Sequence, residues 1–182
     1  MLPDAVPVLG FVTLQRLGEL WLSARNEKRL RARGAHEVGR AHYPLIVALH
    51  TAWLGGLWAL AWNEPADWRT VAAYAAVQIG RYWAIASLGD RWTTRLIVLP
   101  GAPLVRSGPY RFVPHPNYIV VALEIALLPL AFGLVGYAVA FTAANAALLA
   151  WRMHVEDSGL RAGPAMPRSR PHSPVSGRKG PR

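Results

Sequence analysis

The fold is decided by the stretch Tyr118–Trp151, which reads YIVVALEIALLPLAFGLVGYAVAFTAANAALLAW and holds Glu124 as its only charged residue. A helix that crosses a bilayer needs about 20 mostly apolar residues, and this run is much longer. Pro129 and the Gly133/Gly136 pair interrupt it with residues that favour turns. We therefore expect two helices joined by a short turn, a helical hairpin.

Three stretches upstream are also long and apolar enough to span a bilayer, namely Val6–Ala24, Tyr43–Trp62 and Val71–Leu88. With the hairpin they predict an all-α membrane protein of about five transmembrane helices. Composition agrees, because hydrophobic residues make up 53% and charged residues 16% of the 182-residue chain, against roughly 25% charged in soluble domains. We expect one transmembrane domain over residues 1–160, followed by a disordered, basic, Pro/Ser/Arg/Gly-rich tail over residues 161–182.

The charges in the connections predict the orientation. Residues 26–42, residues 89–117 and the tail are rich in Arg and Lys, whereas the 63–67 connection carries two acids and no basic residue. The positive-inside rule places the basic connections and the C-terminus in the cytoplasm and the N-terminus outside, as five spans require. The formal charge of +10 thus reflects topology, and we expect no nucleic-acid partner. Three tryptophans near the expected interfaces are interpreted as headgroup anchors: Trp62, Trp68 and Trp92.

Several kinds of site are excluded by what the sequence lacks. It has no cysteine, so disulfides, thiolate catalysis and cysteine-metal sites are excluded. Its six histidines show no HExxH-type spacing, and we expect no metal site. It has no G-x-G-x-x-G fingerprint, P-loop or G-x-S-x-G motif. A nucleotide-type cofactor would therefore have to bind outside a Rossmann fold.

Some polar residues fall inside the expected spans. Arg16 and Glu19 are three residues apart and share a helix face, so they can pair. Arg81 and Glu124 either neutralise each other across the bundle or line a substrate crevice. His50 is interpreted as a hydrogen-bond donor to a neighbouring helix, with a catalytic role as the alternative. These charges leave open a different class of function, a non-enzymatic membrane scaffold or a small transporter.

The connection before the hairpin concentrates the polar chemistry in the stretch RSGPYRFVPHPNY, residues 106–118. Pro109 and Pro116 fix φ, and the proline that follows His115 keeps this histidine out of a helix. Gly108 allows a tight turn or the close approach of a ligand. This rigid loop and the helix N-terminus behind it suit a carboxylate, and tyrosine faces attract a cation such as a sulfonium. The alternative is an interfacial loop anchored by its aromatic residues.

Two motifs carry a resemblance to a known family. Residues 108–118 resemble the G-x-Y-x-x-x-R-H-P-x-Y signature of the isoprenylcysteine carboxyl methyltransferases, with Pro114 where that signature has arginine. Residues 152–160 resemble the closing R-x-x-x-E-E-x-x-L motif of the same family. Shorter groups upstream, such as Arg81-Tyr82-Trp83, are similar to its bacterial branch, so the resemblance covers about residues 10–160.

The resemblance implies a small helical membrane enzyme that uses S-adenosyl-L-methionine without a Rossmann domain. It implies cofactor contacts from eight residues: Leu104, Val105, Tyr110, His115, Pro116, Asn117, Tyr118 and Glu156. Arg152 would face the acidic group of the acceptor. His115 or Glu156 would be the base for a phenol or an enol, and Arg152 and His115 are the predicted catalytic residues.

The bacterial relatives imply O-methylation of a carboxylate or a hydroxyl on a lipophilic small molecule of the alkylresorcinol, alkylpyrone or isoprenyl type. Such an acceptor would reach the enzyme from the lipid of a bacterial plasma membrane. A type III polyketide synthase pathway would supply acceptors of the first two types. The family commonly continues past the closing motif with an aromatic-rich segment, whereas this chain continues with its basic tail.

Overall fold

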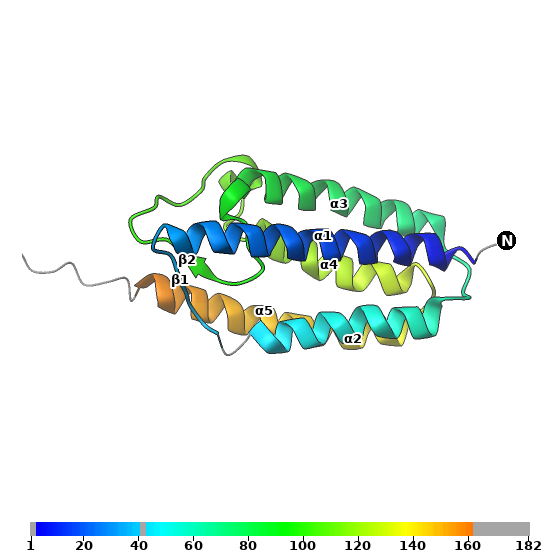
Figure 1. Cartoon of the computed structure of the whole chain (residues 1–182). Helices are drawn as coiled ribbons and strands as arrows, with labels where there is room; N and C mark the ends of the chain where they lie inside the picture. Colours follow the sequence, from blue (N-terminus) through cyan, green and yellow to red (C-terminus); the bar gives the residue numbers. More distant parts are fainter. Residues whose placement is uncertain (1–2, 41–42, 162–182) are drawn as a thin grey trace, which may run out of the picture.

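Long helices lying side by side form the bundle shown in Figure 1. The computed structural model describes residues 3–40 and 43–161, and for residues 155–161 it describes the backbone alone. Its helices are α1 (Ala5–Ala32), α2 (Tyr43–Ala61), α3 (Trp68–Leu88), α4 (Pro116–Leu130) and α5 (Val135–Arg161). The all-α prediction is confirmed. The predicted tail lies outside the described residues, except for Arg161 at the end of α5.

Short elements connect the helices at the end of the bundle away from the N-terminus (Figure 1). They are the 3-10 helices η1 (Gly89–Arg91) and η2 (Gly108–Arg111) and the strands β1 (His36–Glu37) and β2 (Ile97–Val98). The two strands are antiparallel, with His36 opposite Val98 and Glu37 opposite Ile97. This pairing joins the connection after α1 to the connection after α3.

The prediction that residues 26–42 form a connection is wrong for their first part, because α1 continues past the predicted span to Ala32. The additional residues are mostly Arg, Lys and Glu, which are good helix formers even without an apolar face to bury. Arg31 also donates a hydrogen bond to Glu27 one turn earlier, at 2.8 Å. The chain then turns at Gly34, which has a φ of 87°. Because of this extension, polar side chains of α1 such as Asn26 contact the connection that follows α3.

The predicted hairpin is confirmed, with α4 and α5 joined by residues 131–134. Gly133 makes the turn with a φ of 72°, a conformation that favours glycine. Pro129 lies inside the last turn of α4 and not in the connection. Proline has no N–H for the carbonyl four residues before it, and here the indole of Trp53 donates to the Ile125 carbonyl at 3.3 Å instead. The carbonyl that Pro129 leaves without a helical hydrogen bond thus bonds α4 to α2.

The apolar core lies in the half of the bundle near the N-terminus of α1. Fully buried side chains meet there from α1, α2 and α4, among them Leu9, Trp53, Leu57 and Leu128. This packing fixes the helices at one end and leaves the opposite end to the connections.

Large apolar side chains also cover the outside of the bundle. Leu14, Ile79 and Val139 are each more than 60% exposed, as expected of a surface that faces lipid. By length and composition, α2 is the one helix in the described part of the chain that could cross a membrane, and α4 is apolar but shorter. The number of spans therefore stays a prediction.

Candidate functional site

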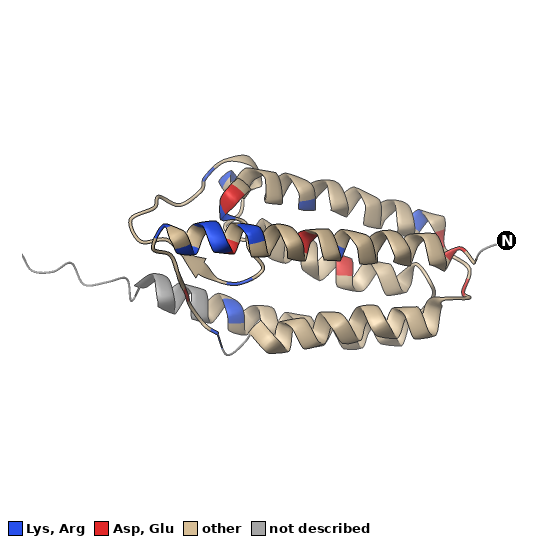
Figure 2. Ribbon diagram, viewed as in Figure 1, with Lys and Arg blue, Asp and Glu red and all other residues tan. Residues whose placement is uncertain are grey.

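A cavity of about 560 Å³ lies between the 88–118 connection and α5. Its walls come from α3 and η1, from the extended residues 92–106, from η2 and from the start of α4, and Leu30 of α1 and Arg152 of α5 complete it. It lies at the end of the bundle where the strands pair (Figure 1). Figure 2 shows that most of the Lys and Arg residues gather at this same end.

Seven of the predicted site residues line this one cavity: Leu104, Val105, Tyr110, His115, Asn117, Tyr118 and Arg152. Pro116 is buried as the first residue of α4 and is not among the lining residues. The side chain of Glu156 lies outside the described residues. The structure therefore brings the loop motif and the first residue of the closing motif together.

Gly108 allows the loop to approach α3 closely. Its φ is 58°, and a Cβ added there would collide with the side chain of Ser87. The Phe112 ring lies 6.5 Å from the Trp83 ring, centroid to centroid, on the same face of α3. The predicted close approach at Gly108 is thus an approach of protein to protein, which fixes η2 and Tyr110 at the cavity wall.

His115 occupies the N-cap position of α4, with φ −127° and ψ 61°, and Pro116 begins the helix. The prediction that His115 stays outside a helix is confirmed. Its ring stacks on the Tyr118 ring, with centroids 5.0 Å apart and planes within 2°. Both rings line the cavity, so proline, N-cap and stacking together fix where the imidazole lies.

Arg152 reaches the cavity from α5. Its Nε donates to the Tyr118 hydroxyl at 2.9 Å, and its Nη1 donates to the Thr94 carbonyl at 3.0 Å. Its guanidinium also lies over the Tyr118 ring, 5.5 Å from the centroid. Both acceptors that hold this guanidinium in the described part of the chain are neutral.

The segment 92–94 was missed by the sequence reasoning, which interpreted Trp92 as a membrane anchor. That interpretation is wrong, because Trp92 is 3% exposed and lines the cavity. Its carbonyl accepts a hydrogen bond from Asn26 at 2.9 Å, and Thr93 also lines the wall. Thr93 and Thr94 follow η1 and Trp92 in the sequence, but nothing in that pattern indicates a partner in α1.

Ion pairs fix the neighbouring strand pair. Glu37 accepts hydrogen bonds from Arg95 at 2.7 Å, from Arg31 at 2.8 Å and from Arg40 at 3.1 Å. Burial raises the pKa of Glu37, but these guanidinium groups outweigh it and hold the pKa below its usual range. The hydrogen bond to Glu37 raises the pKa of Arg95. The carboxylate therefore stays ionised and ties β1 to the cavity residue Arg95.

The chemistry of the cavity fits S-adenosyl-L-methionine. The Asn117 Oδ1 atom is buried beside the cavity without a hydrogen-bond partner in the described part of the chain, so it can accept one from a bound amino group. The Tyr110 ring at the cavity wall is of the kind that attracts a cation. Among the described residues, the lining includes Arg91, Arg106 and Arg152 and no acid, which suits a carboxylate.

The charged residues inside the bundle form a separate buried ion cluster, defined here as Arg16, Glu19, Arg81 and Glu124. Arg81 donates to both carboxylates, twice to Glu19 and once to Glu124. Arg16 also donates to Glu19 at 2.9 Å and to Glu124 at 2.8 Å. The predicted pairing is confirmed, and these charges neutralise one another instead of lining the cavity.

His50 was interpreted as a hydrogen-bond donor to a neighbouring helix. In the structure its ring Nδ1 lies 2.8 Å from the Ile46 carbonyl, so this contact is within its own helix, α2.

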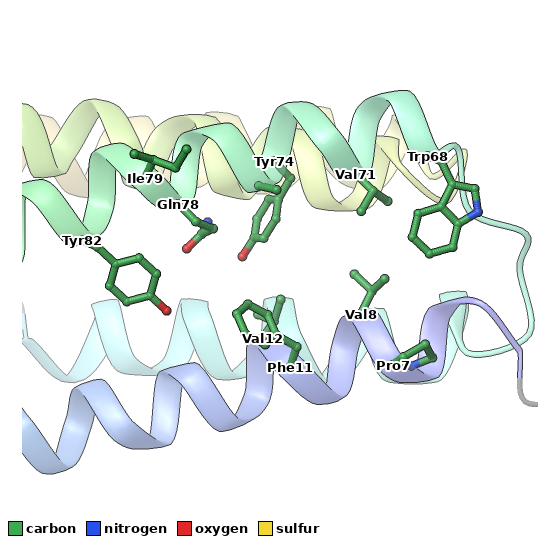
Figure 3. A pocket seen from close by; sticks show the side chains of 11 residues that line it. Pro7, Val8, Phe11, Val12, Trp68, Val71, Tyr74, Gln78, Ile79 and Tyr82 are labelled. Atoms are coloured by element: carbon green, nitrogen blue, oxygen red, sulfur yellow. The ribbon is translucent and has the colours of Figure 1, made fainter.

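A second cavity, of about 450 Å³, is an apolar groove between α1 and α3. Figure 3 shows Val8 and Phe11 of α1 facing Val71 and Tyr74 of α3 across it. None of the predicted cofactor or catalytic residues lines this groove. The polar, arginine-rich cavity at the other end of the bundle is therefore the candidate site.

Comparison with known proteins places the chain in a family. The family described as isoprenylcysteine carboxyl methyltransferase (ICMT) matches residues 70–162. The uncharacterized protein YpbQ of Bacillus subtilis is 38% identical over 85% of this chain and 95% of its own length. An uncharacterized protein of Haemophilus influenzae is 28% identical over 58% of this chain and 64% of its own length. No solved structure matches the chain. This chain belongs to the isoprenylcysteine carboxyl methyltransferase family, whose members are integral-membrane methyltransferases.

Proposed function

We propose that the chain is an integral-membrane, S-adenosyl-L-methionine-dependent O-methyltransferase that acts on a lipophilic small molecule. The observation that carries this proposal is the shared cavity, in which Tyr110, His115, Asn117 and Tyr118 of the loop meet Arg152 of α5. Family membership over residues 70–162 supports the same reaction class. When bound, S-adenosyl-L-methionine supplies a methyl group activated on a sulfonium.

The loop residues would hold the cofactor. Leu104 and Val105 offer apolar contact, Asn117 offers an oxygen that has no partner in the described part of the chain, and Tyr110 offers an aromatic ring. Glu156 stays in the proposal as a contact from the last turns of α5, four residues after Arg152. Methyl transfer depends mainly on alignment and on the removal of water, and a loop fixed by Gly108, Pro116 and ring stacking provides alignment.

Arg152 and His115 would act on the acceptor. A carboxylate, with a pKa of about 4, is already ionised at neutral pH, and the charged guanidinium of Arg152 would bind it. A phenol or an enol must lose a proton, and the His115 imidazole would accept it. Arg152 donates to the Tyr118 hydroxyl at 2.9 Å. This contact fixes the guanidinium and also links it to the stacked rings of His115 and Tyr118.

The acceptor would come from the membrane. The apolar outer surface of the bundle suits lateral arrival from lipid, and the basic end that holds the cavity suits the cytoplasmic side (Figure 2). We place the N-terminus outside, the C-terminus in the cytoplasm and about five helices in a bacterial plasma membrane. Acceptors of the alkylresorcinol, alkylpyrone or isoprenyl type fit this site, and a type III polyketide synthase pathway would supply the first two.

The test is methyl transfer from labelled S-adenosyl-L-methionine by the purified full-length protein in detergent. Two probes separate the acceptor classes, 5-pentadecylresorcinol as a long-chain phenol and N-acetyl-S-farnesylcysteine as a prenylated carboxylate. We expect label in the organic phase with at least one probe or with a bacterial lipid extract, and loss of that label in Arg152→Ala. Binding of the cofactor without transfer to any of these acceptors would contradict the proposed acceptor class.

The alternative, a membrane scaffold or small transporter, depended on the charges inside the bundle. Arg16, Arg81 and Glu124 are accounted for by their mutual ion pairs, so they need no transported substrate. Binding of S-adenosylhomocysteine at the cavity supports the enzyme, whereas its absence supports the scaffold.

A further inference from the structure

Two N-terminal helices contact the segment that holds Arg152. The Thr94 backbone N–H donates to the Ser23 hydroxyl of α1 at 2.9 Å, and the two hydroxyl oxygens of Ser23 and Thr94 are also 2.9 Å apart. The Tyr43 hydroxyl at the start of α2 lies 3.1 Å from the Thr94 hydroxyl. Asn26 of α1 donates to the Trp92 carbonyl at 2.9 Å. Side chains from α1 and α2 thus hold residues 92–94 on several sides.

These contacts are at least partly buried. Ser23 is 3% exposed and Asn26 is 1% exposed. The Arg95 guanidinium lies 4.1 Å from the centroid of the Tyr43 ring, which fixes the ring from its other side. Breaking a hydrogen bond that is shielded from water is costly, because water does not readily replace the lost partner. Segment 92–94 therefore has little freedom to move.

Segment 92–94 provides one of the two hydrogen-bond acceptors that Arg152 has in the described part of the chain. The Arg152 Nη1 atom donates to the Thr94 carbonyl at 3.0 Å, and its Nε donates to Tyr118 at 2.9 Å. The contacts of the Thr94 N–H and hydroxyl fix the Cα atom from which this carbonyl extends, so they limit where the carbonyl can lie. Ser23 and Tyr43 are not among the residues that line the cavity, and in the described part of the chain their hydroxyls are connected to Arg152 through Thr94.

We propose that Ser23 and Tyr43 are positioning residues for Arg152, acting through Thr94. The helices α1 and α2, which lie outside the family match at residues 70–162, would then complete the catalytic site of this chain. The inference rests on the proposed function for the role of Arg152, whereas its structural part, that these hydroxyls fix the guanidinium, does not.

The first experiment measures how firmly Arg152 is held. The full-length protein in detergent is treated with phenylglyoxal, and the modification rate of Arg152 is followed by peptide mass spectrometry. Tyr43→Phe, which loses one hydrogen bond, should raise this rate about fivefold, and Ser23→Ala, which loses two, should raise it at least as much. Ser23→Thr keeps the hydroxyl and should restore the slow rate.

Two matched controls remove hydroxyls elsewhere. Thr13→Val removes the hydroxyl that accepts from the Trp58 indole at 3.0 Å, between α1 and α2. Tyr137→Phe removes the hydroxyl that donates to the Ala52 and Trp53 carbonyls. Neither control should change the rate at Arg152. Equal acceleration in the controls, or none in Ser23→Ala and Tyr43→Phe, would overturn the proposal.

The second experiment asks whether positioning matters for the reaction. With the better of the two acceptor probes, Ser23→Ala should raise the acceptor KM about tenfold and leave the Kd for S-adenosylhomocysteine unchanged. In an Arg152→Lys background the same substitution should have no further effect, since residues that act as one unit are not additive. An additive loss, or weaker cofactor binding, would show a general structural role and overturn the inference.

The two possible failures are distinguishable. If the unmodified protein binds no S-adenosylhomocysteine, the proposed function fails, and the labelling rates still decide whether Ser23 and Tyr43 fix Arg152. If the protein binds the cofactor and transfers methyl groups but Ser23→Ala changes neither labelling nor KM, this inference fails alone.

Discussion

Asn117 is the residue whose position points most directly to a ligand. Its Oδ1 atom is buried and without a partner in the described part of the chain, which costs stability unless a bound molecule donates to it. We predict that Asn117→Leu lowers the affinity for S-adenosylhomocysteine about tenfold while leaving the fold as stable or slightly more stable. Calorimetry and thermal unfolding measure the two effects on the same samples. Loss of stability with unchanged affinity would show that Asn117 serves the fold.

Some site residues could be predicted from the sequence and others could not, and the difference has a physical reason. His115 could be predicted, because a following proline restricts the histidine locally and needs no knowledge of distant contacts. Thr94 could not, because its importance comes from Ser23 and Tyr43, which are far away in the sequence. The partners of Arg152 are likewise visible only once α5 lies beside the connection.

Among the elements, η2 depends on the close approach of Gly108 to α3. Gly108 and Gly101 both have positive φ, at 58° and 74°, but a Cβ at Gly101 would meet open space whereas one at Gly108 would collide with Ser87. We predict that Gly108→Ala destabilises the protein by about 1–3 kcal/mol more than Gly101→Ala, from overpacking alone. Thermal unfolding of the two variants measures the difference. Equal effects would mean that backbone strain, and not the contact with α3, accounts for the glycine.

The β1–β2 pair gives a pH dependence. The folded pKa of Glu37 lies below its ordinary value, so its ion pairs stabilise the fold above the ordinary value of about 4.3. That stabilisation is lost as the pH falls through the lowered folded pKa. We predict that Glu37→Gln is less stable than the unmodified chain at pH 7 by about 1 kcal/mol, since the partner arginines are partly exposed.

The difference between Glu37→Gln and the unmodified chain should close as the pH is lowered below about 4. Unfolding midpoints measured from pH 7 downward follow it, with Glu64→Gln, an exposed acid in the 63–67 connection, as the control. A difference that stays constant down to acid pH would contradict the role given to the Glu37 carboxylate.

The pattern of apolar residues predicts a helix boundary only where the helix buries an apolar face. The hairpin could be predicted because an uninterrupted apolar run has to turn at its glycines, and the turn falls at Gly133. The last turns of α1 could not, because they bury no apolar face and are stabilised by Glu27–Arg31 pairing and by Asn26 hydrogen bonds to another connection. The missed extension is the part of α1 that reaches the site.

In the whole molecule, the buried ion cluster joins α1, α3 and α4. Removing one partner of a buried pair leaves an uncompensated charge, which costs about 3–5 kcal/mol. We predict a loss of this size for Arg81→Leu, which leaves Glu19 and Glu124 short of cations. Arg29→Leu removes an exposed pair with Asp90 and should cost less than about 1 kcal/mol. Similar unfolding midpoints for both variants would show that the cluster is not what fixes these helices.

The central claim is that one cavity at the basic end of the bundle binds S-adenosyl-L-methionine through the loop before α4. The most direct measurement is a calorimetric titration of the purified full-length protein with S-adenosylhomocysteine, repeated with His115→Ala and with Tyr137→Phe as a variant far from the cavity. The expected result is micromolar binding that is lost in His115→Ala and retained in Tyr137→Phe. No binding to the unmodified protein, or equal binding to all three, would contradict it.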